Sequence, residues 1–150
     1  MLRTLPKISF VTDPWVVLQS RLQGTVITPD HLQYDQARQA WNLSVDQRPA
    51  GIVVPKNATD VVEAVRFARS EGLGIAVQAT GHGNVRPAND CLLILTSDMQ
   101  GVTIDATSQT AWVEAGVKWE VVLEKAQAVG LAPLLGSSPD VGAVGYTLGG

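Results

Sequence analysis

The sequence is poor in the residues that build disulfides and metal sites. Its 150 residues include one cysteine, Cys91, and two histidines, His31 and His82. A single cysteine cannot form an internal disulfide, and one cysteine with two histidines cannot assemble a zinc site of the usual kind. We therefore expect no metal. We interpret Cys91 as a small buried hydrophobic residue and His31 as a surface residue.

Positive charge is also scarce. Eleven Lys and Arg residues against fourteen Asp and Glu give a net charge of −3, and the basic residues are scattered, so no basic footprint for nucleic acid exists. No apolar window approaches the length of a membrane span, and residues 1–10 lack the apolar stretch and cleavage site of a signal peptide. These features predict a cytoplasmic protein that binds neither nucleic acid nor a membrane. They leave the oligomeric state open.

The hydrophobic content of 45% is enough for a core, in one domain or two small lobes. We divide the chain into residues 1–47, an amino-terminal helix and an extended connection, and residues 48–150, the main domain. Helical spacing of apolar residues predicts a short amphipathic helix over 13–22, capped by Thr12 or Asp13. The polar segment 25–49 is predicted to be extended and to lay its aromatic side chains onto the core.

Residues 51–77 are predicted to form a β-α-β unit. A β-branched strand over 51–54 ends at Pro55, a helix capped by Thr59 or Asn57 runs to Gly72, and a buried strand follows over 73–77. A right-handed crossover makes the two strands parallel. The helix is predicted to bury its apolar residues, namely Val61, Val62, Val65, Phe67 and Ala68.

The remainder of the chain predicts a second set of elements. An apolar strand over 91–95 is followed by alternating segments over 101–105 and 110–115, which favour a hairpin, and by a helix over 116–129. The fold class is therefore α+β. Residues 134–150 are too rich in glycine for a helix or a plain strand, and we interpret them as a backbone-lined ligand cradle.

The segment 77–84 places His82 between two glycines directly after a predicted strand. Glycine on both sides allows positive φ and close approach to a ligand, and successive N–H groups in such a turn can bind phosphate. The carboxyl ends of strands are common ligand sites in α/β folds. A cofactor loop is the hypothesis, and a tight turn with a surface histidine is the alternative.

With these two loops and the elements between them, residues 48–150 resemble the flavoprotein family that includes vanillyl-alcohol oxidase, in its berberine bridge enzyme-like branch. The resemblance rests on the strand ending at Val54-Pro55, the helix beginning at Thr59-Asp60, the Gly81-His82 loop, and the segment 136–142 that runs into Gly149-Gly150. It implies an α+β FAD-binding domain of the PCMH type, with a small β-α-β lobe and the start of a second lobe. Since the chain stops inside a glycine-rich motif, we expect it to be a truncated piece whose exposed edges promote self-association.

In that family, the first loop binds the FAD pyrophosphate through backbone amides, and a histidine at the position of His82 bonds covalently to the flavin 8-methyl carbon. The second loop lies along the isoalloxazine ring and the diphosphate. The resemblance therefore implies the following FAD-binding residues: Gln78, Ala79, Thr80, Gly81, His82, Gly83, Asn84, Gly136, Ser137, Ser138, Asp140, Val141, Gly142, Val144, Gly145 and Gly149.

Three positions bear on the chemistry. The family loop opens with arginine and glycines where this chain has Gln78, Ala79 and Thr80, so a charged contact is absent there. Doubly linked members carry a second-loop cysteine where this chain has Ser138, which cannot form a thioether, so we expect at most one covalent bond. Val141 matches a position that borders the flavin and gates oxygen, and valine there accompanies oxidases.

The resemblance implies an FAD-dependent oxidoreductase, as an oxidase that takes a hydride from a small alcohol, sugar or amine and is reoxidised by O2. Its substrate lobe and catalytic base are expected beyond Gly150, which would leave this chain catalytically incomplete. The alternatives are a non-catalytic module that binds FAD or another nucleotide, and an interaction domain without a cofactor. A NAD-binding Rossmann domain is disfavoured, because the first strand leads into Pro55, Lys56 and Asn57 rather than a Gly-x-Gly-x-x-Gly turn.

Overall fold

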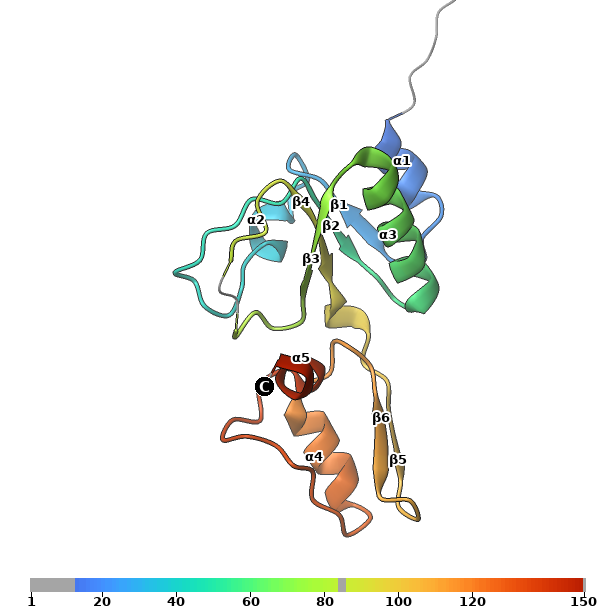
Figure 1. Ribbon diagram of the computed structural model, residues 1–150, viewed down its shortest axis with the longest axis vertical. Coiled ribbons are helices and arrows are strands. Elements are labelled where there is room, and N and C mark those ends of the chain that lie inside the picture. The colour runs from blue at the N-terminus through green and yellow to red at the C-terminus, as the bar shows by residue number, and fades with distance from the viewer. Residues whose placement is uncertain (1–12, 84–85, 150) are drawn as a thin grey trace, which may run out of the picture.

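The computed structural model describes residues 13–83 and 86–149. They form two lobes, one above the other in Figure 1: a first lobe built on a four-stranded sheet, and a second lobe built on a two-stranded sheet. The first lobe contains α1 (Pro14–Gln19), β1 (Thr25–Ile27), α2 (Tyr34–Ala37), β2 (Gly51–Val54), α3 (Ala58–Glu71), β3 (Gly74–Gln78), β4 (Cys91–Leu95) and the 3-10 turn η1 (Thr96–Asp98). The second lobe contains β5 (Val102–Asp105), β6 (Thr110–Val113), α4 (Trp119–Gln127) and α5 (Ala143–Gly149).

The first-lobe sheet has the strand order β1-β2-β4-β3. The apolar strand β4 lies between β2 and β3 and pairs parallel with both, so β2 and β3 are parallel as predicted but are not neighbours. Helices α1 and α3 cover one face, where Leu18, Val53 and Ile94 share a core with Ala64 and Ala68. The other face buries Ile27, Tyr34, Ile52, Ala88 and Leu93.

The segment 25–49 is not the plain extended connection that we predicted. Its first residues form β1, which pairs antiparallel with β2, and Tyr34 begins the short helix α2. Three residues are too few to show a strand period, so only pairing with β2 reveals this strand. Tyr34 is buried and donates a hydrogen bond to the Pro49 carbonyl over 2.6 Å, whereas Trp41 is 62% exposed. The aromatic side chains thus divide between the core and the surface.

One first-lobe burial prediction was wrong and another was right only in part. Strand β3 is at the sheet edge, with Val77 68% exposed, because β4 takes the central place. On α3, Ala68 is buried as predicted and Phe67 packs against the same core, whereas Val62 and Val65 are exposed and the other buried residues are Asp60 and Ala64. Small alanines let the helix approach the sheet closely, and a prediction based on hydrophobicity alone does not take this effect of side-chain size into account.

The ends of α1 and α3 agree with the predicted signals. The Asp13 carboxylate caps α1 by accepting a hydrogen bond from the Trp15 amide, while Thr12 lies outside the described residues. The Asn57 side chain caps α3 in the same way, and Gly72 ends it at φ +68°. Cys91, predicted to be buried, is half-buried at the start of β4.

The second lobe begins with the predicted hairpin, in which Val102 is opposite Val113 and Asp105 is opposite Thr110. Its core holds Val117, Trp119, Val122 and Ala143. The prediction that the last segment contains no helix was wrong, because α5 forms despite Gly145 and Gly149. The buried Ala143, whose amide donates to the Val117 carbonyl over 2.8 Å, ties this helix to the lobe and offsets the poor helix propensity of glycine.

Among the described residues, no helix is both long and apolar enough to cross a membrane. The same residues contain no cluster of three or more His, Cys, Asp or Glu side chains placed to hold a metal ion.

Candidate cofactor site

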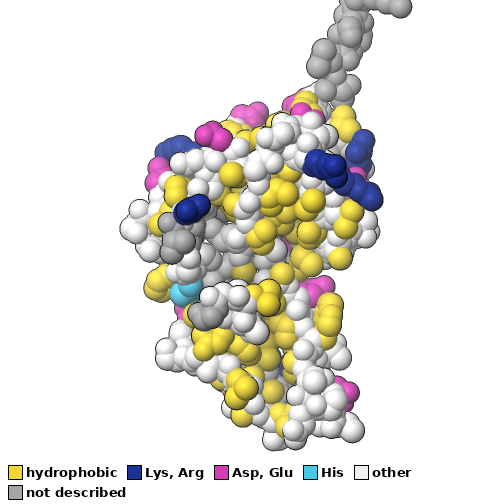
Figure 2. All heavy atoms as spheres, viewed as in Figure 1, with side chains coloured by type: hydrophobic (Ala, Val, Ile, Leu, Met, Phe, Trp, Pro, Cys, Tyr) yellow, Lys and Arg dark blue, Asp and Glu magenta, His cyan; other side chains and the backbone are white. Residues whose placement is uncertain are grey.

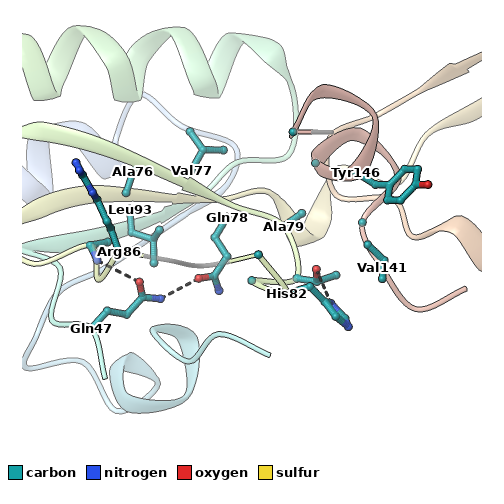
Figure 3. Close-up of a pocket in the computed structure, with 17 residues that line it drawn as sticks. Gln47, Ala76, Val77, Gln78, Ala79, His82, Arg86, Leu93, Val141 and Tyr146 are labelled. Atoms are coloured by element: carbon teal, nitrogen blue, oxygen red, sulfur yellow. Dashed lines mark hydrogen bonds between the residues drawn. The ribbon is translucent and has the colours of Figure 1, made fainter. Parts of the chain in front are cut away.

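A cavity of about 560 Å³ lies where the two lobes meet, at the carboxyl end of β3. Figure 3 shows Gln78, Ala79 and His82 on the first-lobe side of this cavity, and Val141 and Tyr146 on the side of α5. In Figure 2, hydrophobic side chains are exposed along the junction of the lobes. The cavity volume falls within the usual range for small-molecule and cofactor sites, roughly 300–1,000 Å³.

The loop that leaves β3 depends on one glycine. Gly81 has φ +76°, as the sequence predicted for a glycine beside His82, whereas Gly83 does not have a positive φ. A Cβ atom at Gly81 would lie 2.7 Å from the Ala40 Cβ, too close for any side chain. The backbone can therefore turn here and pass against residue 40 only because position 81 is glycine.

His82 is held on several sides. Its Nδ1 lies 3.0 Å from the Thr80 hydroxyl oxygen, its Nε2 lies 3.7 Å from a carboxylate oxygen of Asp140, and its ring stacks on Trp41. The side chain is 19% exposed. His82 is thus a partly buried turn residue rather than one that is fully exposed. His31, in contrast, is exposed as predicted.

Asp140 belongs to the loop before α5 and brings charge to the site from the second lobe. The Ser138 hydroxyl donates a hydrogen bond to its carboxylate. This bond, opposed by partial burial and assisted by the charges of His82 and Lys118, lowers the pKa of Asp140 below its ordinary value. The carboxylate therefore remains ionised beside His82 at neutral pH.

Small residues let the two lobes approach each other closely beside the cavity. A Cβ at Gly142 would lie 3.3 Å from the Ala79 Cβ, tighter than ordinary contact. Gly136 packs against Tyr146, because a Cβ at position 136 would lie 2.9 Å from the Tyr146 ring. The Tyr146 ring in turn meets the Trp119 ring edge-on, with a centroid distance of 5.8 Å. The glycines of the second loop therefore serve close packing as well as access to the cavity.

The structure places most, but not all, of the predicted residues around the cavity. Those that line it are Gln78, Ala79, Thr80, Gly81, His82, Gly83, Val141, Gly142, Gly145 and Gly149. Gly136, Ser137, Ser138, Asp140 and Val144 do not line it, although Asp140 faces His82. Asn84 lies outside the described residues.

Seven further lining residues were missed by the sequence analysis: Gln47, Ala76, Val77, Arg86, Ala88, Leu93 and Tyr146. Five of them come from β3, β4 and the segment just before β4, and Gln47 comes from the segment predicted to be a connection. Arg86 is the most informative omission. It carries positive charge to a cavity whose first loop lacks the arginine found in the flavoprotein family that the chain resembles. In the sequence, its position shortly after Gly81-His82 was the only feature that could have indicated this role.

Gln78 has a structural rather than an electrostatic role. Its side chain is buried, accepts a hydrogen bond from the Gln47 amide over 2.8 Å, and donates one to the Gln39 carbonyl over 3.0 Å. Thr96 adds a bond from its hydroxyl to the Gln78 carbonyl over 3.3 Å. These contacts fix the base of the histidine loop.

The residues present fit a flavin dinucleotide. Five glycines and three alanines are among the residues that line the cavity, so a flat ring can approach their backbone closely, and the Cβ positions at Gly81 and Gly142 leave no room for larger side chains. Arg86 offers a cation suited to a diphosphate. A cavity between two lobes, with glycines and a basic residue in its lining, is suited to a dinucleotide cofactor.

The family is shown by comparison with known proteins. A family model described as "FAD binding domain" matches residues 49–150, so the chain belongs to the FAD binding domain family. The resemblance to the flavoproteins of vanillyl-alcohol oxidase and berberine bridge enzyme is thereby confirmed at the level of the family and the fold.

Three relatives illustrate this placement. YgaK of Bacillus subtilis, an uncharacterized FAD-linked oxidoreductase, is 31% identical over 134 residues, which are 88% of this chain and 30% of the relative. The structure of 6-hydroxy-D-nicotine oxidase from Arthrobacter nicotinovorans superposes with a TM-score of 0.77 at 31% identity, covering 83% of this chain and 28% of that one. BBE-like 1 of Physcomitrella patens shares the fold, with a TM-score of 0.80 at 23% identity over 89% of this chain and 30% of its own. The chain thus spans about 30% of the length of the relatives it matches.

Proposed function

We propose that this chain forms the FAD-binding part of an FAD-dependent oxidase and that His82 is the point of covalent flavin attachment. The observation that carries the proposal is the position of His82. It lines the cavity, and its ring is held by Thr80, Trp41 and Asp140 rather than turned into solvent.

Each wall of the cavity has a role in this proposal. The backbone of residues 79–83 and the Arg86 guanidinium would bind the diphosphate, while Val141, Gly142 and Gly145 would border the flavin ring from the second lobe. When bound, FAD supplies the two-electron chemistry, accepting a hydride from the substrate and passing electrons on to an acceptor. The protein orients the ring and excludes water around it.

Covalent attachment would join one ring nitrogen of His82 to the flavin 8-methyl carbon. The new C–N bond would replace one methyl C–H bond and the imidazole N–H bond, so two protons and two electrons would be given up. O2 would be the oxidant that takes up both electrons and both protons to give hydrogen peroxide. Because Ser138 lies outside the cavity lining and has no thiol, a second link is not expected.

The substrate class we propose is a small alcohol, sugar or amine, with O2 as electron acceptor. One supporting observation is the similarity to 6-hydroxy-D-nicotine oxidase, whose name describes an oxidase acting on a nicotine derivative. The other is that Val141, the position associated with oxygen access, lines the cavity. The catalytic base would lie in residues beyond Gly150, and the protein would work in the cytoplasm.

The test is an absorbance spectrum of the protein, expressed in flavin-replete cells, before and after acid precipitation. We expect yellow colour to stay with the wild-type pellet and to move to the supernatant for His82→Ala, with His31→Ala as the matched control that behaves like wild type. Free release of FAD by the wild type would overturn covalent attachment. Complete absence of flavin would favour the cofactor-free interaction domain. In a longer protein that contains this chain together with a substrate lobe, bound FAD that no alcohol, sugar or amine reduces would favour a non-catalytic module.

A further inference from the structure

A short segment outside the matched FAD-binding region holds the histidine loop in place. The Trp41 amide donates to the Thr80 carbonyl over 2.9 Å, and the Gln39 carbonyl accepts from the Gln78 side chain over 3.0 Å. Between them, Ala40 occupies the space that any side chain at position 81 would need. Residues 39–41 are therefore laid along the loop that carries His82.

Trp41 makes a further contact through its side chain. Its ring stacks on the His82 imidazole with a centroid distance of 4.1 Å and an interplanar angle of 17°. The indole is nevertheless 62% exposed, so burial in a core does not explain its position. Because its backbone amide is bonded to Thr80, the indole is placed over the ring two residues further along.

The contacts around His82 are complementary. The indole covers one face of the imidazole, the Thr80 hydroxyl meets Nδ1, and Asp140 is beyond Nε2. Thr80 and Asp140 act on the ring edge and leave the plane free to tilt. The stacked indole lies against the face of the ring and so restrains its plane.

We propose that Trp41 is a positioning residue for His82, holding the imidazole plane in the orientation from which the ring meets the flavin. That the oriented ring meets the flavin rests on the proposed function above, whereas the orientation of the ring by Trp41 does not. An aromatic contact of this kind changes an equilibrium or a rate by about twofold to tenfold. Loss of Trp41 should therefore slow attachment by that factor without abolishing FAD binding.

The first experiment needs no flavin. The chain has two histidines, so a carbon–proton NMR spectrum of ring-labelled histidine shows one set of signals for His82 and one for His31 as internal reference. Protons above an aromatic face are shielded, so we expect the His82 ring protons upfield of those of His31. The shift should disappear in Trp41→Ala and Trp41→Leu, remain in Trp41→Phe, and be unchanged in Trp112→Ala, which removes another tryptophan that is 62% exposed.

The second experiment measures the rate at which added FAD becomes acid-stable on apoprotein. Trp41→Ala and Trp41→Leu should be about twofold to tenfold slower than wild type, while Trp41→Phe and Trp112→Ala should match it. If wild type forms no acid-stable flavin, the proposed attachment fails. The positioning role is then tested by whether the FAD dissociation constants of Trp41→Ala and Trp41→Leu exceed that of wild type by the same factor.

The two experiments separate the possible outcomes. An unshifted His82 signal in the wild type overturns the stack itself. A shifted signal that Trp41→Ala removes, with no change in attachment rate or FAD affinity, shows a stack without a positioning role and overturns the proposal. A urea unfolding curve for each variant checks that the Trp41 variants remain folded. If only one of Trp41→Ala and Trp41→Leu is folded, the comparison uses that variant.

Discussion

The His82 imidazole and the Asp140 carboxylate connect the two lobes across the cavity, with Nε2 3.7 Å from Oδ2. His82 follows β3 of the first lobe, and Asp140 precedes α5 of the second. The local sequence of neither loop indicates that these two side chains meet. The two loops that the resemblance assigned to one cofactor are thus joined in the structure by a specific pair of side chains.

The ionisation of Asp140 should depend on Ser138. We expect Ser138→Ala to raise the pKa of Asp140 toward its ordinary value, because the Ser138 hydrogen bond is the main influence that lowers it. The attraction to protonated His82 is present while the carboxylate is charged and is lost as the pH falls through the lowered pKa. Carboxyl-carbon NMR titration measures this directly. Ser70→Ala, on the exposed end of α3, serves as the control, and an unchanged Asp140 titration in Ser138→Ala would contradict the assignment.

The turn at Gly81 should not tolerate alanine. In Gly81→Ala the new Cβ would clash with Ala40 at 2.7 Å and the residue would be held at φ +76°. Together these costs should destabilise the protein by about 2–4 kcal/mol. Gly83→Ala is the matched control, since its Cβ would meet nothing within 4 Å and its φ is not positive. Urea unfolding measures both, and equal midpoints for the two variants would refute this account of the loop.

Asp60 should be a structural carboxylate whose effect depends on pH. It is buried, and its oxygens accept hydrogen bonds from the amides of Gln23, Gly24 and Lys56, each over 2.9 Å. Burial alone would raise the pKa of Asp60, but these three bonds outweigh it and lower the pKa below the ordinary value. Its stabilising contribution is therefore complete above the unfolded-state pKa and is lost as the pH falls through the lowered folded-state pKa.

Asp60→Asn should accordingly lose about 1–3 kcal/mol of unfolding free energy at neutral pH, because an amide cannot accept all three bonds. The difference from wild type should shrink in acid as wild-type Asp60 becomes protonated. Urea unfolding across a pH series measures this, with Glu124→Gln on the exposed face of α4 as the control. A difference that stays constant down to strong acid would show that Asp60 contributes through shape alone.

Arg86 should contribute to FAD affinity through charge. Arg86→Gln should weaken binding by about tenfold or less, as expected for a partly solvated contact to a diphosphate, and the loss should diminish as salt rises. Arg69→Gln, in the last turn of α3, removes a basic residue that does not line the cavity. Fluorescence titration with FAD at low and high salt compares the two variants. Equal affinities would mean that Arg86 lines the cavity without contacting the dinucleotide.

Many local features were predictable from the sequence. Asn57 and Gly72 mark the two ends of α3, the run 91–95 forms a strand, and the alternation around residues 101–115 forms a hairpin. These features depend on capping, β-branching and turn chemistry, which act within a few residues. The Gly81-His82 loop was found for the same reason, since a glycine that must adopt positive φ leaves a local signal.

Other features depended on which segments meet. Strand β3 looks like a buried strand in sequence but is at the edge, since β4 pairs between it and β2. Helix α5 forms through glycine-rich sequence because Ala143 is buried in the second lobe. Trp41 and Arg86 reach the site from segments with no cofactor motif.

The sequence by itself thus determined the β-α-β unit, the two glycine loops and the family they indicate, because glycine turns, caps and apolar periods are local in origin. Only the tertiary structure decided that Trp41 lies on His82, that Asp140 faces the same ring, and that the buried Gln78 side chain is hydrogen-bonded to Gln47. The physical reason is that stacking, ion pairing and buried hydrogen bonds join residues far apart in the chain, and folding alone brings them within reach.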